Sequence, residues 1–541
     1  MFRRFGILLM VAVVGFIYQE LLFSQDLPVI TTTSAETTGE NPEPPKGVEV
    51  QARGPIHEAF MTPTAEPKPT YGVPKKPPEP IEEMPPDEKP EGDAVWIGGY
   101  WAWDDDRSDY LWVSGCWRIK PPGKDWVPGY WREVSGQHQW VPGFWRTVEE
   151  QQARDVTYYP EPPPAPDLAA PPPAPEPDMF YVPGHWLWVG DHYVWRAGYH
   201  TRARTGYVYV NSHYRWTPFG FVFVAGYWDY AIPRRGVLYA PVYVDAVVVG
   251  PRFVYTPYYA VSDSIIVDAY FVRPGFCHFY YGDYYGPRYV SIGFHCGYHY
   301  SRHHYDAVVV YHRWEHRHTP HWHDTHISVT IARNAGRAPL PPRTLVQQNN
   351  ITVINNKTTN VYNTKVIAPT KTVVANRGAK TVPLNQQARM QVKESANTFQ
   401  KAAVTQRVKA ESAPPGLKPA AKPRTASLDL PQNQIPTKPL AKSGLPKNPN
   451  PGVTTSLPKK QGDSDGPPKQ NSAKQEFKGS PGIPTKAPGN NAPKAKGPDG
   501  PGPGPGPALR PGNPPKAGPP PDRPPPAKRP SDEGKKKGDK R

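Results

Sequence analysis

The sequence predicts a mainly β protein, in which antiparallel tryptophan-rich hairpins form a meander flanked by long, disordered proline-rich segments. Two observations lead to this prediction. All 16 Trp lie between Trp96 and Trp322, whereas the stretch from Glu411 to Arg541 holds 32 Pro and a single aromatic residue, Phe477. A segment so poor in apolar groups buries too little surface to offset its loss of conformational entropy. The core must therefore come from the middle of the chain.

Changes in composition divide the chain into successive segments. In order, they are residues 1–24, a signal peptide or N-terminal membrane anchor; 25–93, a disordered Pro/Glu-rich linker; 94–154, a first Trp-repeat array; 155–178, a Pro-rich hinge; 179–236, a second Trp-repeat array; 237–340, a Tyr/His-rich β region with a short helix; 341–412, a polar Asn/Thr segment with a helix; and 413–541, a disordered basic tail rich in Pro, Gly and Lys.

The N-terminus has the residue order of an export signal. Arg3 and Arg4 precede an apolar run from Phe5 to Tyr18, as in a secretory signal peptide. The run is shorter than the ~20 residues of a membrane-spanning helix, but Leu21–Phe23 resumes it and no cleavage site is obvious. Cleavage and retention as an inner-membrane anchor through residues 5–23 both stay open. We expect an exported protein, located in the periplasm, the cell envelope or outside the cell.

The formal net charge of +16 is concentrated at the C-terminus. Residues 401–541 carry 27 Lys+Arg against 10 Asp+Glu, so the rest of the chain is near neutral. Such a tail is either a solvated spacer or a contact for an anionic polymer or lipid. Nucleic acid is not an expected partner, because the lysines lack the interleaved aromatic residues on which bases stack.

A six-residue block of the form aromatic-x-x-Gly-x-aromatic recurs in the middle of the chain. Several successive blocks start fourteen residues apart or a multiple of that, and a decayed copy at Tyr209–Tyr214 occupies one slot. This period predicts a structural repeat. The copies are Trp96–Trp101, Trp112–Trp117, Trp126–Trp131, Trp140–Trp145, Tyr181–Trp186, Trp195–His200 and Phe223–Trp228.

The spacing between blocks predicts hairpins with aromatic residues directly opposite one another. Two-residue turns fit at Ser135-Gly136 and at Gly190-Asp191, the second as a type II′ turn, and a four-residue loop fits at Lys120–Gly123. The predicted pairs are Trp131 with Trp140, Trp186 with Trp195, Trp188 with Tyr193, and Trp117 with Trp126.

Each block also predicts a β-bulge at its glycine. In a regular strand, residues five apart point to opposite faces, and a one-residue bulge with positive φ at glycine would place both aromatic residues on one face. The expected bulge glycines are Gly99, Gly115, Gly129, Gly143, Gly184, Gly198 and Gly226. The expected aromatic face comprises Trp96, Trp101, Trp112, Trp117, Trp126, Trp131, Trp140, Trp145, Trp186, Trp195 and Trp228.

These blocks resemble the YXWGXW (WxxGxW) repeat of exported bacterial proteins. The resemblance covers about Trp96–Trp145 and Tyr181–Trp228. Because that family is defined by its sequence rather than by an activity, the resemblance implies export and repeat architecture, and no catalytic residue. Whether the aromatic face is a buried core, a sugar-stacking platform or a protein contact stays open.

The second half of the core region predicts more antiparallel sheet and two helices. Val237–Val309 is dense in Tyr and Val and is punctuated by Gly and Pro, which is typical of short strands. Tyr305–His318 has the pattern of a helix that stops before Pro320. Leu345–Val374 suggests polar strands or an extended segment, and Gln386–Ser412 an isolated amphipathic helix.

Residues 278–326 hold 11 of the 17 His, which raises the question of a metal site. A hairpin turning near residue 286 would place Cys277 opposite Cys296, with a His pair on the other face. That arrangement favours a Cys277–Cys296 disulfide, or two buried thiols, over one metal centre. His312 and His316, at i and i+4, form only half a metal site. We therefore expect no cofactor and no native metal.

No common catalytic pattern is present: the sequence has no GxSxG elbow, Walker loop, GxGxxG fingerprint or HExxH. Asp104–Asp106 has the character of a turn rather than of an acid/base pair. We expect a non-enzymatic exported envelope protein with a structural or interaction role, whose partner is a cell-wall polysaccharide or an envelope protein. The alternatives are a carbohydrate-binding module that uses exposed Trp and a His-based metal binder.

Overall fold

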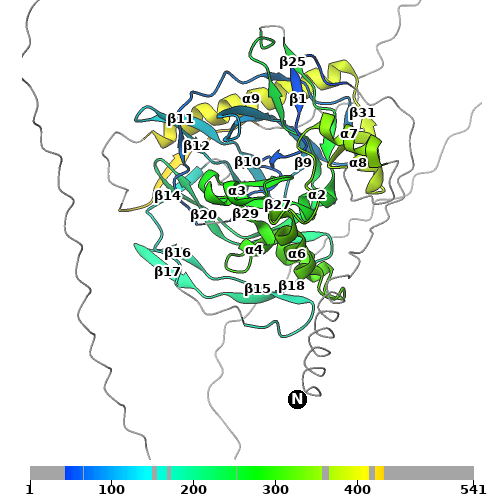
Figure 1. Ribbon diagram of the computed structural model, residues 1–541. Helices are drawn as coiled ribbons and strands as arrows, with labels where there is room; N and C mark the ends of the chain where they lie inside the picture. Colours follow the sequence, from blue (N-terminus) through cyan, green and yellow to red (C-terminus); the bar gives the residue numbers. More distant parts are fainter. Residues whose placement is uncertain are drawn as a thin grey trace, which may run out of the picture. The chain divides into compact units, whose positions relative to one another are not determined.

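The computed structural model describes residues 43–64, 66–148, 155–166, 172–250, 253–355, 365–412 and 421–431 (Figure 1). Strand residues outnumber helix residues, 35% against 23%, and nearly all strand pairs are antiparallel, so the mainly β prediction is confirmed. The predicted signal segment and most of the predicted tail lie outside the described residues. Within those ranges, no helix is both long and apolar enough to span a membrane.

The two repeat arrays form four long hairpins, each built from four short strands. In every hairpin the two outer strands pair with each other, and so do the two inner strands. Hairpin I contains β6 (Ala94–Ile97), β7 (Tyr100–Asp104), β8 (Asp109–Val113) and β9 (Cys116–Ile119); hairpin II contains β10 (Lys124–Val127), β11 (Tyr130–Val134), β12 (Gln137–Val141) and β13 (Phe144–Thr147); hairpin III contains β15 (Met179–Val182), β16 (His185–Val189), β17 (His192–Arg196) and β18 (Tyr199–Arg202); hairpin IV contains β19 (Tyr207–Val210), β20 (His213–Thr217), β21 (Gly220–Val224) and β22 (Tyr227–Tyr230).

The two predicted short turns are confirmed. In hairpin II, Ser135 and Gly136 have φ of 51° and 76°, as a type I′ turn requires. In hairpin III, Gly190 has φ of 61°, which fits the first central position of a type II′ turn. The three aromatic pairs predicted from these turns face each other: Trp131 with Trp140, Trp186 with Trp195, and Trp188 with Tyr193.

The third predicted hairpin, around Lys120–Gly123, is wrong. Trp117 pairs with Trp96 instead of Trp126, and Trp126 pairs with Trp145. Residues 120–123 therefore connect hairpin I to hairpin II. The arrays are a series of separate hairpins rather than a continuous meander.

The predicted β-bulges are also wrong. Each hairpin arm is interrupted for two residues at its midpoint, but the register is unchanged across the interruption. In hairpin II, for example, Val127 pairs with Phe144 before it and Tyr130 pairs with Val141 after it. No residue is inserted, and none of the seven expected bulge glycines has positive φ.

Without a slip in register, residues five apart along an arm alternate between faces. In hairpin I, Trp96 and Trp117 belong to one hydrophobic cluster, whereas Trp101 and Trp112 belong to another. The prediction that both aromatic residues of a block share one face is therefore wrong for this hairpin. Its indoles contribute to two cores.

The predicted N-terminal linker is largely folded. From residue 43 it adds short strands to distant parts of the chain, including β1 (Val48–Val50), which pairs with β24 (Val242–Val244). Ala52, Ile56 and Ala59 are completely buried. The segment is ordered although it is poor in apolar residues, because its few apolar side chains lie between strands that other regions supply.

The predicted Pro-rich hinge begins as a strand, β14 (Asp155–Tyr159). It lies in a four-stranded sheet of order β20-β21-β14-β32, where β32 (Arg424–Ser427) comes from the predicted tail.

The other strands are β2 (Gly54–Pro55), β3 (Gly72–Val73), β4 (Glu82–Glu83), β5 (Glu88–Pro90), β23 (Gly236–Leu238), β25 (Val254–Tyr255), β26 (Tyr259–Val261), β27 (Tyr270–Arg273), β28 (His278–Tyr281), β29 (His295–Cys296), β30 (Ile367–Pro369) and β31 (Thr381–Pro383).

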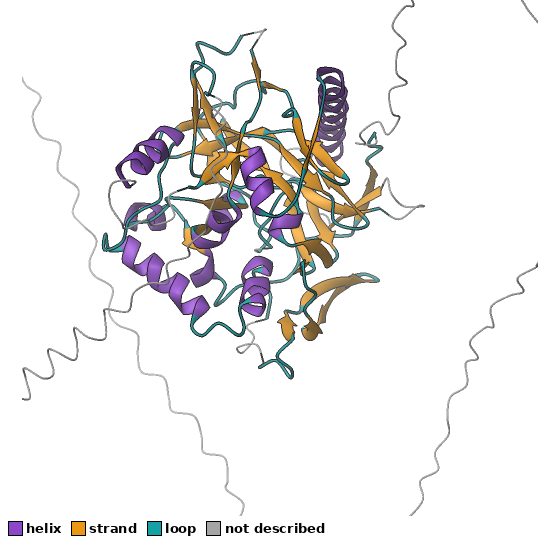
Figure 2. Cartoon of the chain, turned by 90° about the vertical axis from the view of Figure 1, so that its right-hand side faces the viewer, coloured by secondary structure: helices purple, strands orange, loops and turns teal. Residues whose placement is uncertain are grey.

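The Tyr/His-rich region combines a sheet of order β2-β28-β27-β29 with short helices, and most helices lie on one side of the strands (Figure 2). The predicted helix within Tyr305–His318 is confirmed as α5. The polar segment after Leu345 begins as a helix, α7, and not as a strand. The helices are α2 (Asp263–Asp268), α3 (Pro287–Ser291), α4 (Gly297–Tyr300), α5 (Ala307–Glu315), α6 (Trp322–Asn334), α7 (Leu345–Asn355), α8 (Thr370–Asn376) and α9 (Gln386–Glu411), with 3-10 turns at Ile232–Arg234 and Pro274–Phe276.

The predicted Cys277–Cys296 disulfide is wrong: both thiols are free. The chain near residue 286 begins helix α3 instead of turning as a hairpin, and β27 lies between β28 and β29. The Sγ atom of Cys277 accepts a hydrogen bond from Arg215 Nη1 at 2.8 Å, and that of Cys296 lies 3.4 Å from Thr330 Oγ1.

Helix α9 begins and ends close to the predicted positions, but it is not isolated. One face packs on the hairpins along most of its length, with Val392, Ala396, Phe399 and Ala403 buried at spacings of three and four residues. In Figure 1, α9 and hairpin III lie at opposite edges of the described part of the chain.

Candidate functional site

The midpoint of each hairpin explains why the block needs glycine. In hairpin II, a Cβ atom on Gly129 would lie 2.4 Å from Trp140 Cζ2, and one on Gly143 would lie 2.4 Å from Trp126 Cζ2. In both cases the ring is the first aromatic residue of the block across the hairpin. The same rule holds for the other block glycines, so the glycine makes room for a ring of the opposite arm.

These rings meet in pairs at similar distances. The eight cross-hairpin pairs formed by the first and last aromatic residues of the blocks have ring centroids 5.1–5.5 Å apart in edge-to-face or tilted arrangements, which suits the quadrupoles of aromatic rings. The pairs are Trp96/Trp117, Trp101/Trp112, Trp126/Trp145, Trp131/Trp140, Tyr181/His200, Trp186/Trp195, Tyr209/Trp228 and Tyr214/Phe223.

At the midpoint of hairpin I, a buried carboxylate accepts hydrogen bonds from backbone N–H groups that have no partner in the strand ladders. Glu83 accepts hydrogen bonds from the backbone N–H groups of Gly99 and Gly115 at 3.0–3.1 Å and from Trp112 Nε1 at 3.1 Å. Burial raises the pKa of Glu83 to about 7, although these donors favour the ionised form. On the same midpoint, Gln400 of α9 donates to the carbonyl of Gly99 at 3.3 Å.

Hairpin II repeats this arrangement with different residues. Glu58 accepts from Gly143 N–H at 3.0 Å and from Trp140 Nε1 at 2.9 Å, and burial raises the pKa of Glu58 to about 7. Arg407 of α9 donates to the carbonyls of Pro128 and Pro142 at 2.7 and 3.1 Å.

Helix α9 therefore contacts both midpoints from one face. Gln400 and Arg407 are two helical turns apart, and each donates to carbonyls that have no partner in the strand ladders. Arg407 is fully buried and pairs with Glu411 at 2.8 Å. Glu411 also accepts hydrogen bonds from the hydroxyls of Tyr130 and Tyr158. The helix is thus an integral part of the repeat core.

Hairpins III and IV differ from this pattern. In hairpin IV, the decayed block has Ser212 in place of glycine, and its hydroxyl accepts from Gly226 N–H at 2.9 Å. In hairpin III, no side chain of the described residues bonds to the N–H groups of Gly184 or Gly198. Within the described ranges, hairpin III thus has neither a buried carboxylate nor a helix across its midpoint.

The predicted aromatic face divides accordingly into a buried and a half-buried part. Seven of the eight block tryptophans in hairpins I and II are at most 5% exposed, and Trp131 is half-buried, as are Trp186, Trp195 and Trp228 of the second array. Next to the indoles of hairpin III, Val189 is 48% exposed and Tyr199 is 46% exposed.

Hairpin III packs on hairpin IV through aromatic rings. Phe180 lies 6.4 Å from Tyr209, and Tyr193 lies 5.8 Å from Tyr214, measured between ring centroids. Its strands pair with no strand outside the hairpin among the described residues. Side-chain packing, rather than a shared sheet, therefore holds hairpin III on the protein.

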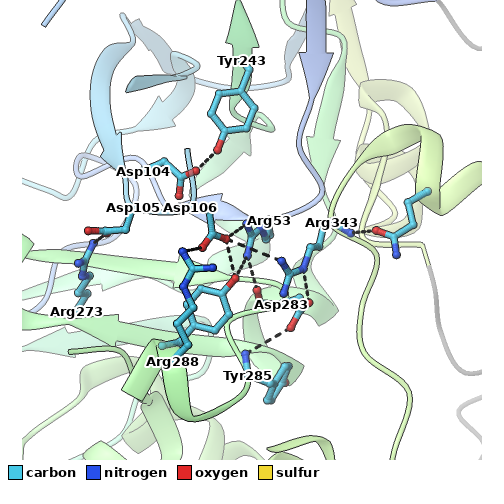
Figure 3. A network of polar contacts seen from close by, with 12 residues as sticks. Arg53, Asp104, Asp105, Asp106, Tyr243, Arg273, Asp283, Tyr285, Arg288 and Arg343 are labelled. Atoms are coloured by element: carbon cyan, nitrogen blue, oxygen red, sulfur yellow. Dashed lines mark hydrogen bonds and ion pairs between the residues drawn. The ribbon is translucent and has the colours of Figure 1, made fainter. Parts of the chain in front are cut away.

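The acidic turn of hairpin I anchors this hairpin to the Tyr/His-rich region (Figure 3). Asp104 bonds to the hydroxyl of Tyr243, and Asp105 pairs with Arg273 at 2.6 Å. Asp106 contacts several arginines from separate segments, namely Arg53, Arg288 and Arg343. Each of the three carboxylates has a basic or hydroxyl partner, which fits the structural role that the sequence predicts for this turn.

The two histidines singled out from the sequence do lie together. His312 Nδ1 is 3.0 Å from Glu315 Oε2, and ligand atoms of His312, Glu315 and His316 lie within 4.8 Å of one another. Glu315 was not predicted as part of this group, although its i+3 spacing from His312 is visible in the sequence. These residues offer two nitrogen donors and one oxygen donor at the C-terminal end of α5, where His316 follows the last helical residue.

The midpoint partners Glu58, Glu83, Gln400 and Arg407 were not predicted. The two glutamates lie in the segment expected to be a disordered linker, and no spacing links them to the glycines that they bind. The i, i+4 spacing of Arg407 and Glu411 is the one signal of this site in the sequence. It does not indicate burial, because ion pairs with this spacing usually lie on the surface of a helix.

The WXXGXW repeat profile, which represents two copies of the block, matches residues 95–118, 126–146, 177–199 and 204–228. Each match falls on one of the four hairpins, so two blocks make one structural unit. No curated protein and no solved structure matches the chain. In these four stretches, therefore, the chain carries the WXXGXW repeat.

Proposed function

We propose that this protein is a non-enzymatic component of the cell envelope with a structural or interaction role. In this proposal, hairpins I and II are the structural core and hairpin III is the interaction surface. The observation that carries it is the difference between equivalent positions. Trp101 and Trp112, the inner pair of hairpin I, are 5% and 2% exposed, whereas Trp186 and Trp195, the inner pair of hairpin III, are half-buried beside exposed apolar residues.

The chemistry of the buried charged groups supports a structural role. Glu58 and Glu83 have pKa values raised to about 7, a property often found at catalytic sites. Here, however, repeat N–H groups occupy their oxygens, so the carboxylates serve the fold. The N-terminal order of two arginines followed by an apolar run supports export.

The proposal can be tested by site-specific photo-crosslinking in cells that make the full chain. A photoreactive amino acid in place of Tyr199 should give a crosslinked species in the envelope fraction. That species should disappear when Trp186 and Trp195 are both replaced by Ala. The matched control carries the same probe at Val247, which is 90% exposed. A cytosolic location, or identical crosslinks from both positions, would contradict the proposal.

The half-buried indoles of hairpin III also favour a second candidate function, binding of a wall polysaccharide. The test is a tryptophan fluorescence titration of the whole protein with wall glycans. Quenching that saturates and is lost in Trp195→Ala would support carbohydrate binding. A flat titration with every glycan would remove this candidate.

A further inference from the structure

A proline-rich stretch of the chain lies against hairpin III. Tyr193 Oη donates a hydrogen bond to the backbone carbonyl of Pro160 at 2.6 Å, and Trp186 Nε1 donates to that of Pro164 at 3.2 Å. Both donors belong to the aromatic ladder of β16 and β17. Two aromatic side chains of the ladder thus hold two carbonyls of one segment.

The sequence of this segment, PEPPPAP over residues 160–166, determines its conformation. Each proline has φ near −65°, and a residue that precedes proline is restricted to extended conformations. The stretch therefore favours a polyproline II helix, which has no internal hydrogen bonds and leaves its carbonyls free to accept from a partner. In that conformation, the carbonyls of Pro160 and Pro164 lie about 12 Å apart along the axis.

A second described segment, residues 172–178 directly before β15, places acidic residues against a basic residue at the end of hairpin III. Arg202 pairs with Asp178 at 2.5 Å and with Glu176 at 2.6 Å. Just before them, the carbonyl of Pro172 lies 3.3 Å from His200 Nε2. The surface therefore offers aromatic donors to proline carbonyls and a cation to carboxylates.

We propose that hairpin III is a binding site for acidic, proline-rich segments in the polyproline II conformation, and that residues 160–166 and 172–178 supply its intramolecular ligand. The external ligand is a segment of a partner protein with the same chemistry, which displaces residues 160–166. This inference rests on the proposed function, because it names the partner of that surface. Aromatic surfaces suit such ligands because the preformed helix loses little entropy on binding.

An external ligand must compete with a tethered one. A flexible tether gives the internal segment an effective concentration on the order of millimolar, so the unmodified protein should bind added peptide weakly. Replacing Pro162, Pro163 and Pro164 together by Ser weakens the internal ligand without touching hairpin III. This triple-Ser variant of the full chain is the reference protein for the test.

The experiment measures fluorescence anisotropy of a labelled peptide with the sequence of residues 159–166, YPEPPPAP. The triple-Ser variant should bind it at least about tenfold more tightly than the unmodified protein. Trp186→Phe or Tyr193→Phe, each placed in the triple-Ser background, should weaken binding by about tenfold, the effect of one lost hydrogen bond at the upper end of its range. Circular dichroism checks that each variant is folded.

The matched control is Trp188→Phe in the same background. Trp188 lies in the same ladder, but its Nε1 donates to the carbonyl of Gly190 in its own turn at 3.0 Å. This substitution should leave peptide affinity unchanged. If Trp188→Phe and Trp186→Phe have equal effects, the hydrogen-bond assignment is overturned.

Three further outcomes would overturn the proposal. The first is that a peptide with alanine at every proline position binds equally well. The second is that no folded variant binds the proline-rich peptide. The third is that a peptide from residues 511–526 of the basic tail binds more tightly, which would make the tail the occupant. A crosslink from position 199 that depends on Trp186 and Trp195, together with any of these results, would preserve the interaction surface while rejecting an acidic, proline-rich segment as its partner.

Discussion

At the scale of single residues, the glycine of each block is required by the ring on the opposite arm. We expected a glycine with positive φ in a bulge, and the structure shows neither. Instead, the side chain at this position must be absent because a tryptophan or tyrosine ring of the opposite arm lies over it. The fixed spacing of the block sets the distance between one arm's glycine and the other arm's ring.

Gly129→Ala should therefore destabilise the protein. Its Cβ atom would lie 2.4 Å from Trp140 and 2.7 Å from the carbonyl of Val141, and Trp140 is only 3% exposed. Overpacking of this kind costs about 1–3 kcal/mol. Urea unfolding measures the change, with Gly250→Ala as the control because its Cβ would have nothing within 4 Å. Equal unfolding free energies for the two variants would refute the explanation.

Glu83 should give stability a specific dependence on pH. Its pKa is about 7 in the folded protein and near 4.5 ordinarily, so between these values the folded state binds more protons than the unfolded state. The free energy of unfolding must therefore fall as pH rises from roughly 5 to roughly 8, by up to about 3 kcal/mol from this group.

Glu83→Gln removes this titration. The variant should be less stable than the unmodified protein at low pH, because its amide replaces one of the two oxygens that face three N–H donors with an NH2 group that cannot accept. The difference in unfolding free energy should narrow as pH rises, because only the unmodified protein loses stability through this titration. Denaturant titrations at pH 5 and pH 8 provide the comparison. The control is Glu82→Gln, since the side chain of Glu82 is 50% exposed. If the difference in unfolding free energy between the variant and the unmodified protein is the same at both pH values, the raised pKa does not belong to Glu83.

At the scale of elements, α9 joins the two midpoints of the first array. Its boundaries follow from local signals, since Asn385 caps its first turn by accepting from Ala388 N–H at 2.8 Å. Its position does not, because Arg407 and Glu411 have partners more than 250 residues away in sequence. Because the pair is buried, removing only one of its two side chains leaves the other charge without a partner and lowers the stability of the protein.

Arg407→Met should therefore destabilise the protein by about 3–5 kcal/mol, because it leaves the Glu411 carboxylate buried without its cation. Glu411→Leu should also be destabilising, and the double variant should lose less than the sum of the two. A double-mutant cycle on unfolding free energies tests this coupling. The control on the same helix is Lys393→Met, whose ion pair with Glu82 is partly exposed and should contribute less than about 1 kcal/mol. Additive losses would show that the two side chains act independently.

At the scale of the whole molecule, the four hairpins have the same design but different roles. Hairpins I and II are enclosed by the N-terminal strands, the Tyr/His-rich region and α9. Hairpin III is attached through side-chain packing, and its ends lie close together, since Ala203 N–H donates to the carbonyl of Asp178 at 2.8 Å.

Deletion of residues 179–202 should accordingly leave a folded protein. Joining Asp178 to Ala203 requires little rearrangement, and the deletion removes half-buried rather than buried indoles. Thermal unfolding followed by circular dichroism should remain cooperative, with a modestly lower Tm. Deletion of residues 124–147, hairpin II, should abolish cooperative unfolding because it removes three tryptophans that are at most 4% exposed. If both deletions unfold the protein, hairpin III belongs to the core.

Local patterns in the sequence determined the elements whose interactions lie within a few residues. The turns at Ser135-Gly136 and Gly190, the aromatic pairs beside them and the limits of α9 are of this kind, since turn chemistry, strand register and helix caps act locally. The block period also predicted the repeat, although not that two blocks make one hairpin.

Tertiary structure alone decided which faces the indoles occupy and what satisfies the midpoints. Glu58 and Glu83 reach glycines that no spacing connects to them, β27 separates two strands that were expected to pair, and an apparently unstructured linker is ordered by strands from elsewhere. The physical reason is that a peptide group left unpaired inside a core must find a partner. The fold as a whole, rather than neighbouring residues, supplies it.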